Sequence, residues 1–321
     1  MKHLLAAVSM SFGSLFIGAA SQAAEYPDHP VRLVVPQAPG GASDTLARLI
    51  AQGLSEKWGQ SVVVENKAGA GGNIGLQAVS QSPADGYTLL MTYEGTQAIN
   101  VSLRDLPFDP VKDFTAIAPV ATVPFVVTLN KDLKPNTFQE FVALAKERKD
   151  MTFGSAGSGT VNHLLGEMVN HITGTKLIHV PYKGAGPALT DLLGERIDAV
   201  FTSYPSVSQQ VASHTVRALA STSATRPAQL KDLPTIAESG YPDFDVNPWF
   251  GLFAPKDTSP DIVQKINSDV NAILDDPDTL AIISKQGAAP LKATPDEFKS
   301  MLQRDITKWA KVVTSSGARI N

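Results

Sequence analysis

The stretch VVPQAPGGASDTLARLI, residues 34–50, joins an apolar strand to a helical pattern through two consecutive glycines, Gly40 and Gly41. A helix N-terminus presents unpaired N–H groups and about half a positive charge, and adjacent glycines let an anion come within hydrogen-bond distance of them. Ser43 or Asp44 is the expected N-cap. Two interpretations stay open from these residues alone: an anion cradle, or a tight turn before a capped helix.

The alternation of strand and helix continues along the chain. The first helix is followed by strand 61–66 (SVVVEN), a helix at 72–80 and strand 87–92 (YTLLMT). A second series begins with a helix at 138–148 and ends with a strand at 216–220. Short strands joined by helices predict parallel βαβ units and a doubly wound α/β sheet.

Two extended segments enclose the second series. They lie around residues 119–130 (PVATVPFVVTLN) and around 246–254 (VNPWFGLFA). Two crossings that bracket a central block predict two lobes joined by a two-strand hinge, with residues 24–122 and 249–321 in lobe 1 and residues 123–248 in lobe 2. The chain ends with three helical segments, at 260–274, 278–286 and 295–315.

The N-terminus has the pattern of an export signal. A positively charged start and an apolar run at 4–20 precede SQA (21–23), with small residues placed for cleavage after Ala23. The run is short for a membrane span of about 20 residues, although an uncleaved anchor helix is the alternative. With no cysteine for a lipid anchor or a disulfide, we expect a free periplasmic protein.

Composition limits the remaining classes of function. The chain has 321 residues, 43% of them hydrophobic and 18% charged, which suits a globular protein of two domains. Its net charge of −4 gives no basic surface of the kind that binds phosphate backbones. Nucleic acid is therefore not an expected partner.

A second glycine-rich junction lies in lobe 2. FGSAGSGT (153–160) follows a strand and opens the helix VNHLLGEMVNHI. Hydroxyls of Ser155, Ser158 and Thr160 add donors beside the backbone amides. Ligands in open α/β sheets bind beyond the carboxyl ends of the strands, where both junctions lie. The pair predicts an anion clamp with one glycine loop in each lobe.

Patterns for nucleotide binding, covalent catalysis and metals do not occur in the sequence. Neither glycine run fits G-x-G-x-x-G, no G-x-x-x-x-G-K-[ST] loop occurs, and Ser158 lies in AGSGT rather than in G-x-S-x-G. The six histidines form no H-x-x-x-H pair, and His163 suits a capping or structural role better than that of a base. We expect no catalytic residue, no metal site and no cofactor.

Six motifs follow one another after the signal: PQAPGGASDTLARL, VENKAGAGGNIG, TYEGTQAIN, FGSAGSGTVNHL, VPYKGAGPALTDLLGERIDAVF and NPWFGLFAP. Their combination and order resemble the Bug proteins, the solute-binding components of tripartite tricarboxylate transporters, over essentially the whole mature chain. The resemblance implies a periplasmic-binding-protein type II fold (Venus flytrap), reversible capture of a small organic carboxylate, and delivery to the subunits of a membrane permease.

The resemblance also implies where the ligand binds. In such proteins backbone amides, hydroxyls and ordered waters of the two glycine loops hold a ligand carboxylate. Asp44 is expected to accept helix N–H bonds and shape its loop without touching the anion; a solvated surface acid is the alternative. Carried over to this sequence, the implied positions are Gly40, Gly41, Ala42, Ser43 and Asp44 in lobe 1, and Ser155, Gly157, Ser158, Gly159 and Thr160 in lobe 2.

Ligand choice is expected from residues outside these loops. Tyr93 and Glu94 depart from the small residues of the family: Tyr93 is expected to stack on a flat ligand and Glu94 to accept from an amine, amide or hydroxyl. This pair favours an aromatic or nitrogen-bearing carboxylate over citrate, with a position on the rim as the alternative. Tyr182 and Ser203 are further candidates in lobe 2, and Lys183 is either a partner for a distal carboxylate or an exposed lysine.

Two motifs are expected to serve the fold. The loop GAGGNIG (69–75) shapes lobe 1, and Trp249 and Phe250 pack the hinge. The leading function is thus a monomeric binding protein for uptake. A binding protein that presents its ligand to a sensor kinase uses the same closed pair of lobes and stays open, whereas the lack of a nucleophile–base set disfavours a secreted enzyme.

Overall fold

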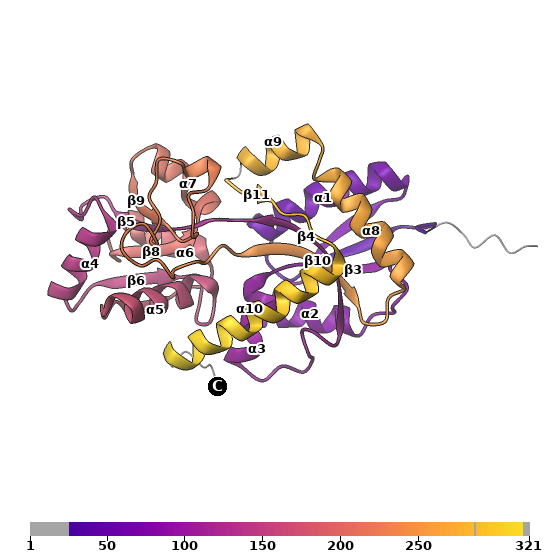
Figure 1. Ribbon diagram of the computed structural model, residues 1–321, viewed down its shortest axis with the longest axis horizontal. Helices are drawn as coiled ribbons and strands as arrows, with labels where there is room; N and C mark the ends of the chain where they lie inside the picture. Colours follow the sequence, from indigo (N-terminus) through magenta and orange to yellow (C-terminus); the bar gives the residue numbers. More distant parts are fainter. Residues whose placement is uncertain (1–25, 286, 317–321) are drawn as a thin grey trace, which may run out of the picture.

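The computed structural model describes residues 26–285 and 287–316, so the signal peptide predicted at 1–23 lies outside the described residues. Two α/β lobes lie side by side along the long axis of the molecule (Figure 1). Lobe 1 is built on a six-stranded sheet with the order β11-β4-β10-β3-β1-β2, and lobe 2 on a five-stranded sheet with the order β7-β6-β8-β5-β9.

Lobe 1 contains the first and the last part of the described chain. Its strands are β1 (Val31–Val35), β2 (Val62–Asn66), β3 (Thr88–Tyr93), β4 (Phe114–Thr122), β10 (Trp249–Pro255) and β11 (Ala289–Pro290). Its helices are α1 (Ala42–Trp58), α2 (Asn73–Ser80), α3 (Asn100–Leu103), α8 (Pro260–Ile273), α9 (Pro277–Lys285) and α10 (Pro295–Ser316), with short turns η1 (Ala70–Gly72) and η2 (Gly95–Ile99).

Lobe 2 is formed by the middle of the chain. Its strands are β5 (Phe125–Asn130), β6 (Thr152–Ser155), β7 (Ile178–Pro181), β8 (Ala199–Ser203) and β9 (Val216–Ser221). Its helices are α4 (Phe138–Glu147), α5 (Val161–Thr173), α6 (Ala185–Leu193) and α7 (Tyr204–Ala212), followed by the turn η3 (Ala228–Leu230). The membership of the two sheets supports the proposed division into lobes, whose boundaries at residues 123 and 248 stay a prediction.

The parallel pairing of the strands determines where the loops that follow them lie. β1 pairs in parallel with β2 and β3, and β6 pairs in parallel with β7 and β8. The carboxyl ends of these strands therefore meet at one edge of each sheet, together with the loops that follow them. β1 is buried at every residue except Arg32, as expected for an inner strand with helices on both faces.

The N-cap of α1 differs from the sequence prediction. Gly41, not Ser43 or Asp44, precedes the helix, because the Gly41 carbonyl already accepts a hydrogen bond from Thr45 N at 3.0 Å. The helix then buries Leu46 and other apolar residues at four-residue spacing against the sheet.

Helix α7 was not predicted from the sequence. Pro205 lies in its first turn, a position that proline favours. The segment has little apolar periodicity, since Val207 is its one buried residue. A helix of this kind forms because it packs on β8 and β9, and no local pattern in the sequence indicates that packing.

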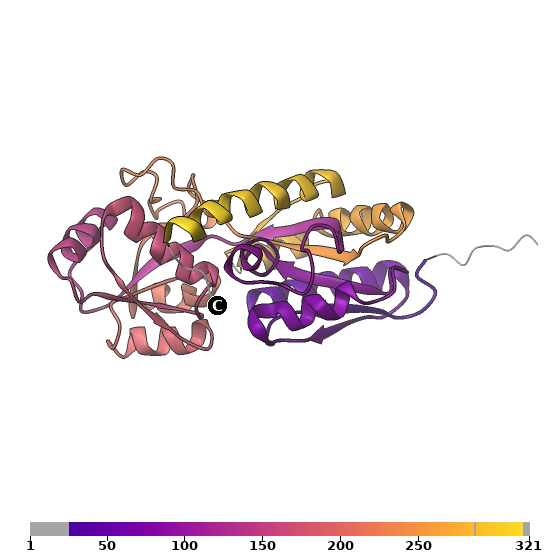
Figure 2. The same cartoon turned by 90° about the horizontal axis from the view of Figure 1, so that it is seen from below.

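Two passages of the chain and a long helix connect the lobes. The chain passes from β4 to β5 and returns before β10, and Val123 N donates to Pro248 O between the two passages at 2.9 Å. Helix α10 runs along lobe 1 and reaches α5 of lobe 2 (Figures 1 and 2). Its Trp309 and Val313 belong to an apolar core that includes residues of both lobes.

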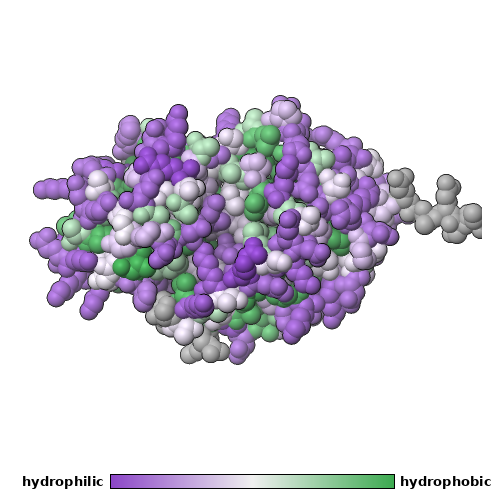
Figure 3. Space-filling view, in the orientation of Figure 1, coloured by the Kyte–Doolittle hydropathy of each residue, from purple (hydrophilic) through white to green (hydrophobic). Residues whose placement is uncertain are grey.

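Hydrophilic residues cover most of the face shown in Figure 3. Large apolar side chains with high exposure, such as Val63 in lobe 1 and Ile178 in lobe 2, are scattered over different elements. Within residues 26–285 and 287–316, no helix has the length and apolar character needed to cross a membrane.

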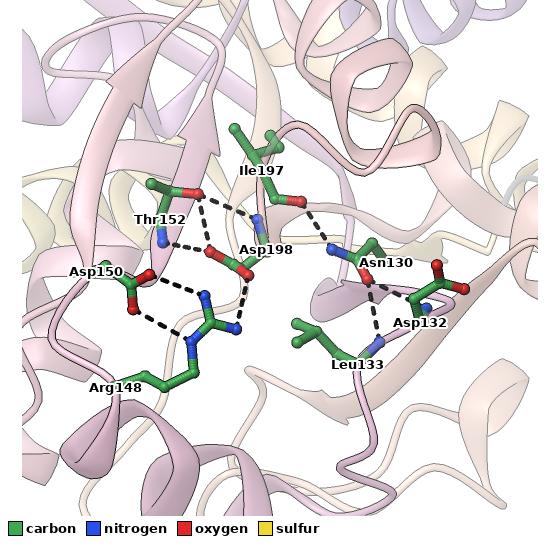
Figure 4. A network of polar contacts seen from close by, with 8 residues as sticks. All are labelled: Asn130, Asp132, Leu133, Arg148, Asp150, Thr152, Ile197 and Asp198. Carbon is green, nitrogen blue, oxygen red and sulfur yellow. Dashed lines mark hydrogen bonds and ion pairs between the residues drawn. The ribbon is translucent and has the colours of Figure 1, made fainter.

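A polar network fastens the end of the lobe 2 sheet that lies away from the carboxyl ends of its parallel strands (Figure 4). Asp198 accepts from Thr152 N at 2.8 Å and from Thr152 Oγ1 at 3.1 Å, and Arg148 lies 3.6 Å from the same carboxylate. Asn130 Nδ2 donates to Ile197 O at 3.1 Å. Because these groups satisfy one another, we assign the network to the fold.

Candidate functional site

A cleft of about 790 Å³ lies between the lobes, at the carboxyl ends of the parallel strands. This volume is typical of sites for small molecules. Each wall consists of three loops, and each loop follows a parallel strand. Lobe 1 contributes residues 36–41 after β1, Gly69, Gly71 and Gly72 after β2, and Tyr93, Thr96, Asn100 and Arg104 after β3. Lobe 2 contributes Ala156 and residues 158–160 after β6, residues 183–187 and Leu189 after β7, and Ser206 after β8.

The first glycine loop meets the cleft with its backbone. Gly40 has a φ of +86°, a backbone conformation that residues with a side chain rarely adopt, whereas Gly41 has a φ of −85° and a ψ of 174°. A Cβ at Gly41 would have one neighbouring atom, Ala38 O, at 4.0 Å. The N-terminus of α1 directly follows, so its free N–H groups and its dipole suit an anion in the cleft.

Asp44 holds this loop from behind. Its Oδ2 accepts from Gly40 N and from Arg48 Nε, both at 3.0 Å, and its Oδ1 accepts from Asn66 Nδ2 at 2.9 Å. Burial opposes ionisation of Asp44, but the hydrogen bonds from Arg48, Gly40 and Asn66 outweigh it and hold its pKa below the ordinary value. Asp44 lies outside the cleft lining, so its charge shapes the loop.

The second glycine loop is held by its own hydroxyls. Thr160 is the N-cap of α5: its Oγ1 accepts from His163 N and donates to Gly157 O at 2.7 Å. Ser155 Oγ accepts from Gly157 N at 3.1 Å, and Gly159 N donates to His163 Nδ1 at 3.1 Å. Ser158, Gly159 and Thr160 line the cleft, whereas Ser155 and Gly157 brace them from inside.

Two stacked imidazoles lie beneath this loop. The rings of His163 and His179 are 3.9 Å apart, and burial lowers the pKa of both; the charge of His163 lowers that of His179 further, to about 4. Both rings are therefore neutral at pH 7, which leaves Nδ1 of His163 free to accept from the loop.

One of these imidazoles lies beside a serine. Ser155 Oγ is 2.6 Å from His179 Nε2, which is the spacing of a nucleophile–base pair. Ser155 is nevertheless fully buried and lies outside the cleft lining, so the pair braces the loop. Across the described ranges, no three His, Asp or Glu side chains lie close enough together to hold a metal ion.

Tyr93 and Glu94 point to opposite sides of their segment. Tyr93 lines the cleft, with its ring stacked 5.9 Å from that of Phe250. Glu94 is 4% exposed and lies outside the lining; its Oε1 accepts from Trp309 Nε1 of α10. Burial and the nearby charge of Asp305 raise the pKa of Glu94 from 4.5 to about 7. The structure thus corrects the expectation that Glu94 faces the ligand.

Asn100 and Arg104, on the segment after Tyr93, were not predicted from the sequence; together with Thr96 they form a polar stripe. Thr96 lies in the π-helical turn η2, Asn100 begins helix α3, and Arg104 follows α3 in an extended conformation; all three line the cleft. The four-residue spacing from Thr96 is the signal in the sequence that could have identified Asn100, whereas Arg104 lies beyond the helix, where helical spacing predicts nothing.

The loop GAGGNIG takes part in the cleft as well as in the fold. Gly69, Gly71 and Gly72 line the cleft, which corrects the expectation of a purely structural loop. Asn100 Nδ2 donates to Gly71 O at 3.0 Å, and a Cβ at Gly72 would lie 2.5 Å from the Thr96 side chain. Glycine therefore lets the loop pack closely on the polar stripe.

The predicted contact residues divide into two groups. Those in the cleft lining are Gly40, Gly41, Tyr93, Ser158, Gly159 and Thr160; those outside it are Ala42, Ser43, Asp44, Glu94, Ser155, Gly157, Tyr182 and Ser203. Tyr182 donates to Asp191 at 2.8 Å instead of facing the cleft. Ser203 Oγ lies 2.7 Å from Ser206 Oγ, and Ser206 takes the position in the lining that was expected for Ser203.

The charged side chains in the cleft are cations. Arg104 lines the wall of lobe 1 and Lys183 the wall of lobe 2. The lining contains no aspartate or glutamate among the residues that the structure describes. Both glycine loops and both cations therefore favour a negatively charged ligand.

Known proteins are similar to this chain in sequence and architecture. The family model described as "Tripartite tricarboxylate transporter family receptor" matches residues 46–318. Protein BugT of Bordetella pertussis is 38% identical over 323 aligned positions, which cover 100% of this chain and 99% of BugT.

Two solved structures extend the likeness to three dimensions. The periplasmic binding protein BugD has 36% identity and a TM-score of 0.82, over 92% of this chain and 99% of BugD. Rpa4515 of R. palustris, solved with adipate, has 35% identity and a TM-score of 0.85, over 91% of this chain and 99% of Rpa4515. The predicted two-lobed fold of the periplasmic binding proteins is confirmed. The chain thus belongs to the tripartite tricarboxylate transporter family of receptors, as a solute-binding protein of Bug type.

Proposed function

We propose that this chain captures a small organic carboxylate in the periplasm and delivers it to the membrane permease of a tripartite tricarboxylate transporter. The observation that carries the proposal is the cleft, where a glycine loop that leads into a helix N-terminus lines each of the two opposite walls. R. palustris Rpa4515, a structural relative of similar length, was solved with adipate, which is a carboxylate.

The ligand leaves the cleft chemically unchanged in this proposal. Ser155 and His179 form the nearest hydroxyl–imidazole pair, but they lie behind the loop and hold its shape. Export by a signal at 1–23 and action as a monomer complete the proposal, since one chain supplies both walls of the cleft.

The sequence-based preference for a nitrogen-bearing acid rested on Glu94. Because this carboxyl group accepts a hydrogen bond from Trp309 in the core, it supplies no acceptor to the cleft. Tyr93 remains as an apolar wall, and the positive charges of Arg104 and Lys183 favour additional negative charge on the ligand.

A thermal-shift screen of the mature protein against mono-, di- and tricarboxylates, aromatic acids and amino acids tests binding. A ligand at 100 times its dissociation constant stabilises the native state by about 2.7 kcal/mol, which raises the melting temperature by a few degrees. We expect at least one carboxylate to do so and to be recovered intact by NMR. Stabilisation by no carboxylate, or conversion of the ligand, would contradict the proposal.

Delivery needs a second measurement. Cells that lack the gene for this chain should fail to accumulate the radiolabelled ligand, and the intact gene should restore accumulation. Uptake that is equal with and without the gene would leave capture in place and exclude delivery.

A further inference from the structure

Arg104 is a cation in the cleft without a complete set of partners. Its Nε is buried and has no hydrogen-bond partner. The guanidinium extends toward the second loop of lobe 1, because a Cβ built on Gly71 would lie 3.8 Å from Arg104 Nη2. A buried donor that is left unpaired costs stability, and the cost rises for a charged group. Arg104 Nε therefore has no hydrogen-bond acceptor among the described residues.

The neighbours of Arg104 are already committed. Asn100 Nδ2 donates to Gly71 O and to Asn73 Oδ1, both at 3.0 Å. Thr96 Oγ1 accepts from Gln37 Nε2 at 3.0 Å. These bonds hold the side chains of Thr96 and Asn100, so the part of the polar stripe next to Arg104 is fixed in place.

We propose that Arg104 binds a second carboxylate of the ligand, so that the cleft selects dicarboxylates while its glycine loops hold the first carboxylate. The inference rests on the proposed function and deepens it. The planar guanidinium offers parallel N–H donors that match both oxygens of a carboxylate, which is the strongest form of such a pair.

The other cation of the cleft is less suited to this role. Lys183 is exposed on the wall of lobe 2, where water solvates its ammonium group. An exposed ion pair contributes little because water and salt screen it. Lys183 raises the positive potential of the cleft, whereas Arg104 distinguishes a second carboxylate from a neutral group.

The test compares diacids with their own half-esters. Calorimetry measures the affinity of the mature protein for succinate, glutarate and adipate, and for the monomethyl ester of each, which has nearly the same length and one negative charge fewer. The variants are Arg104→Gln, Arg104→Lys and the control Lys134→Gln, which removes an exposed lysine in the loop after β5 of lobe 2. Melting temperatures equal to that of the parent establish that each variant is folded.

We expect the parent to prefer its best diacid over the half-ester by at least about tenfold. Arg104→Gln should weaken the diacid by about 10- to 100-fold and change the half-ester by no more than about twofold, so the preference disappears. Arg104→Lys should restore part of it, because lysine keeps the charge without the two parallel donors. Lys134→Gln should behave like the parent.

Three results would overturn the inference. In the first, Arg104→Gln weakens binding of the diacid and of its half-ester equally, which indicates a structural role. In the second, Arg104→Gln keeps the preference for the diacid over its half-ester. In the third, the parent binds a monocarboxylate from the screen but none of the diacids, which excludes the role of Arg104 and leaves the proposed function standing. If no carboxylate binds, the proposed function fails as well.

Discussion

Glu94 shows how two adjacent residues can serve different parts of a protein. Tyr93 forms a wall of the cleft, while Glu94 lies in the core of lobe 1 beside Trp309. Asp305 lies close enough to raise the pKa of Glu94, and Lys308 is near enough to oppose that increase. Asp305 itself accepts from Trp249 Nε1 at 2.8 Å. The cluster ties α10 to the strand that lines the cleft.

The raised pKa of Glu94 predicts a dependence of stability on pH. The unfolded carboxyl group ionises near 4.5 and the folded one near 7, so the folded state binds more protons between these values. Its contribution to the free energy of unfolding therefore falls as the pH rises from 4.5 to 7, by up to about 1.4 kcal/mol per pH unit. Glu94→Gln keeps an acceptor for Trp309 and should flatten this decline in urea unfolding curves. Parallel curves for parent and variant would contradict the assignment.

The two glycines of the first loop differ in what they require. Gly40→Ala puts a side chain at a φ of +86° and should lower the free energy of unfolding by about 1–2 kcal/mol. Gly41→Ala meets no strain at a φ of −85°, and the lower entropy of the unfolded chain offsets part of the cost of alanine at an N-cap, so it should lose less stability than Gly40→Ala. Gly41→Val should also fold but bind carboxylates more weakly, because its side chain occupies the anion cradle. Urea unfolding and calorimetry measure both effects, and equal stability of the two alanine variants would refute the distinction.

At the scale of elements, a helix can pack closely on a sheet where the residue at the contact is a glycine and has no side chain. Gly166 of α5 faces the ring of Phe153 on β6, and a Cβ there would lie 2.2 Å from Phe153 Cε2. Apart from its two chain neighbours, Gly186 of α6 has no atom within 4 Å of such a Cβ. The two positions therefore separate helix propensity from packing.

Gly166→Ala should lower the free energy of unfolding by about 1–3 kcal/mol, because overpacking outweighs the gain of about 1 kcal/mol in helix propensity. Gly186→Ala should change it by less than about 1 kcal/mol, since the gain in helix propensity is opposed by the contact of its Cβ with the ring of Pro187. Guanidinium unfolding of both variants checks the difference. A stabilised Gly166→Ala protein would mean that the α5–β6 contact is looser than described.

At the scale of the whole molecule, the lobes are joined by two passages of the chain and by contact with α10. The two glycine loops lie on opposite walls of the cleft. A ligand that touches both walls stabilises a closed arrangement by its difference in affinity for the two states.

Saturating ligand should therefore reduce the radius of gyration measured by small-angle X-ray scattering. The control is a folded Gly41→Val protein at the same ligand concentration, which should keep the profile of the free protein because it binds weakly. Identical profiles of the parent with and without a ligand verified by calorimetry would indicate a rigid receptor.

Local patterns in the sequence determined the alternation of strands and helices, the two glycine junctions and the division of the chain by two extended crossings. These features depend on neighbouring residues, since periodicity and glycine conformation act over a few positions. That Asp44 shapes its loop could be predicted for the same reason, but its predicted helix N–H partners were wrong: it accepts from Gly40 N before the helix and from the side chains of Arg48 and Asn66.

Only the tertiary structure decided which side chains face the cleft. Glu94 turns away because its partner Trp309 is 215 residues distant in sequence and buries it in the core. Arg104, the extended residue that follows α3, lines the cleft because the fold brings it beside the loop around Gly71. Such choices follow from packing between elements far apart in the chain, where burial and charge outweigh what a residue's neighbours in sequence suggest.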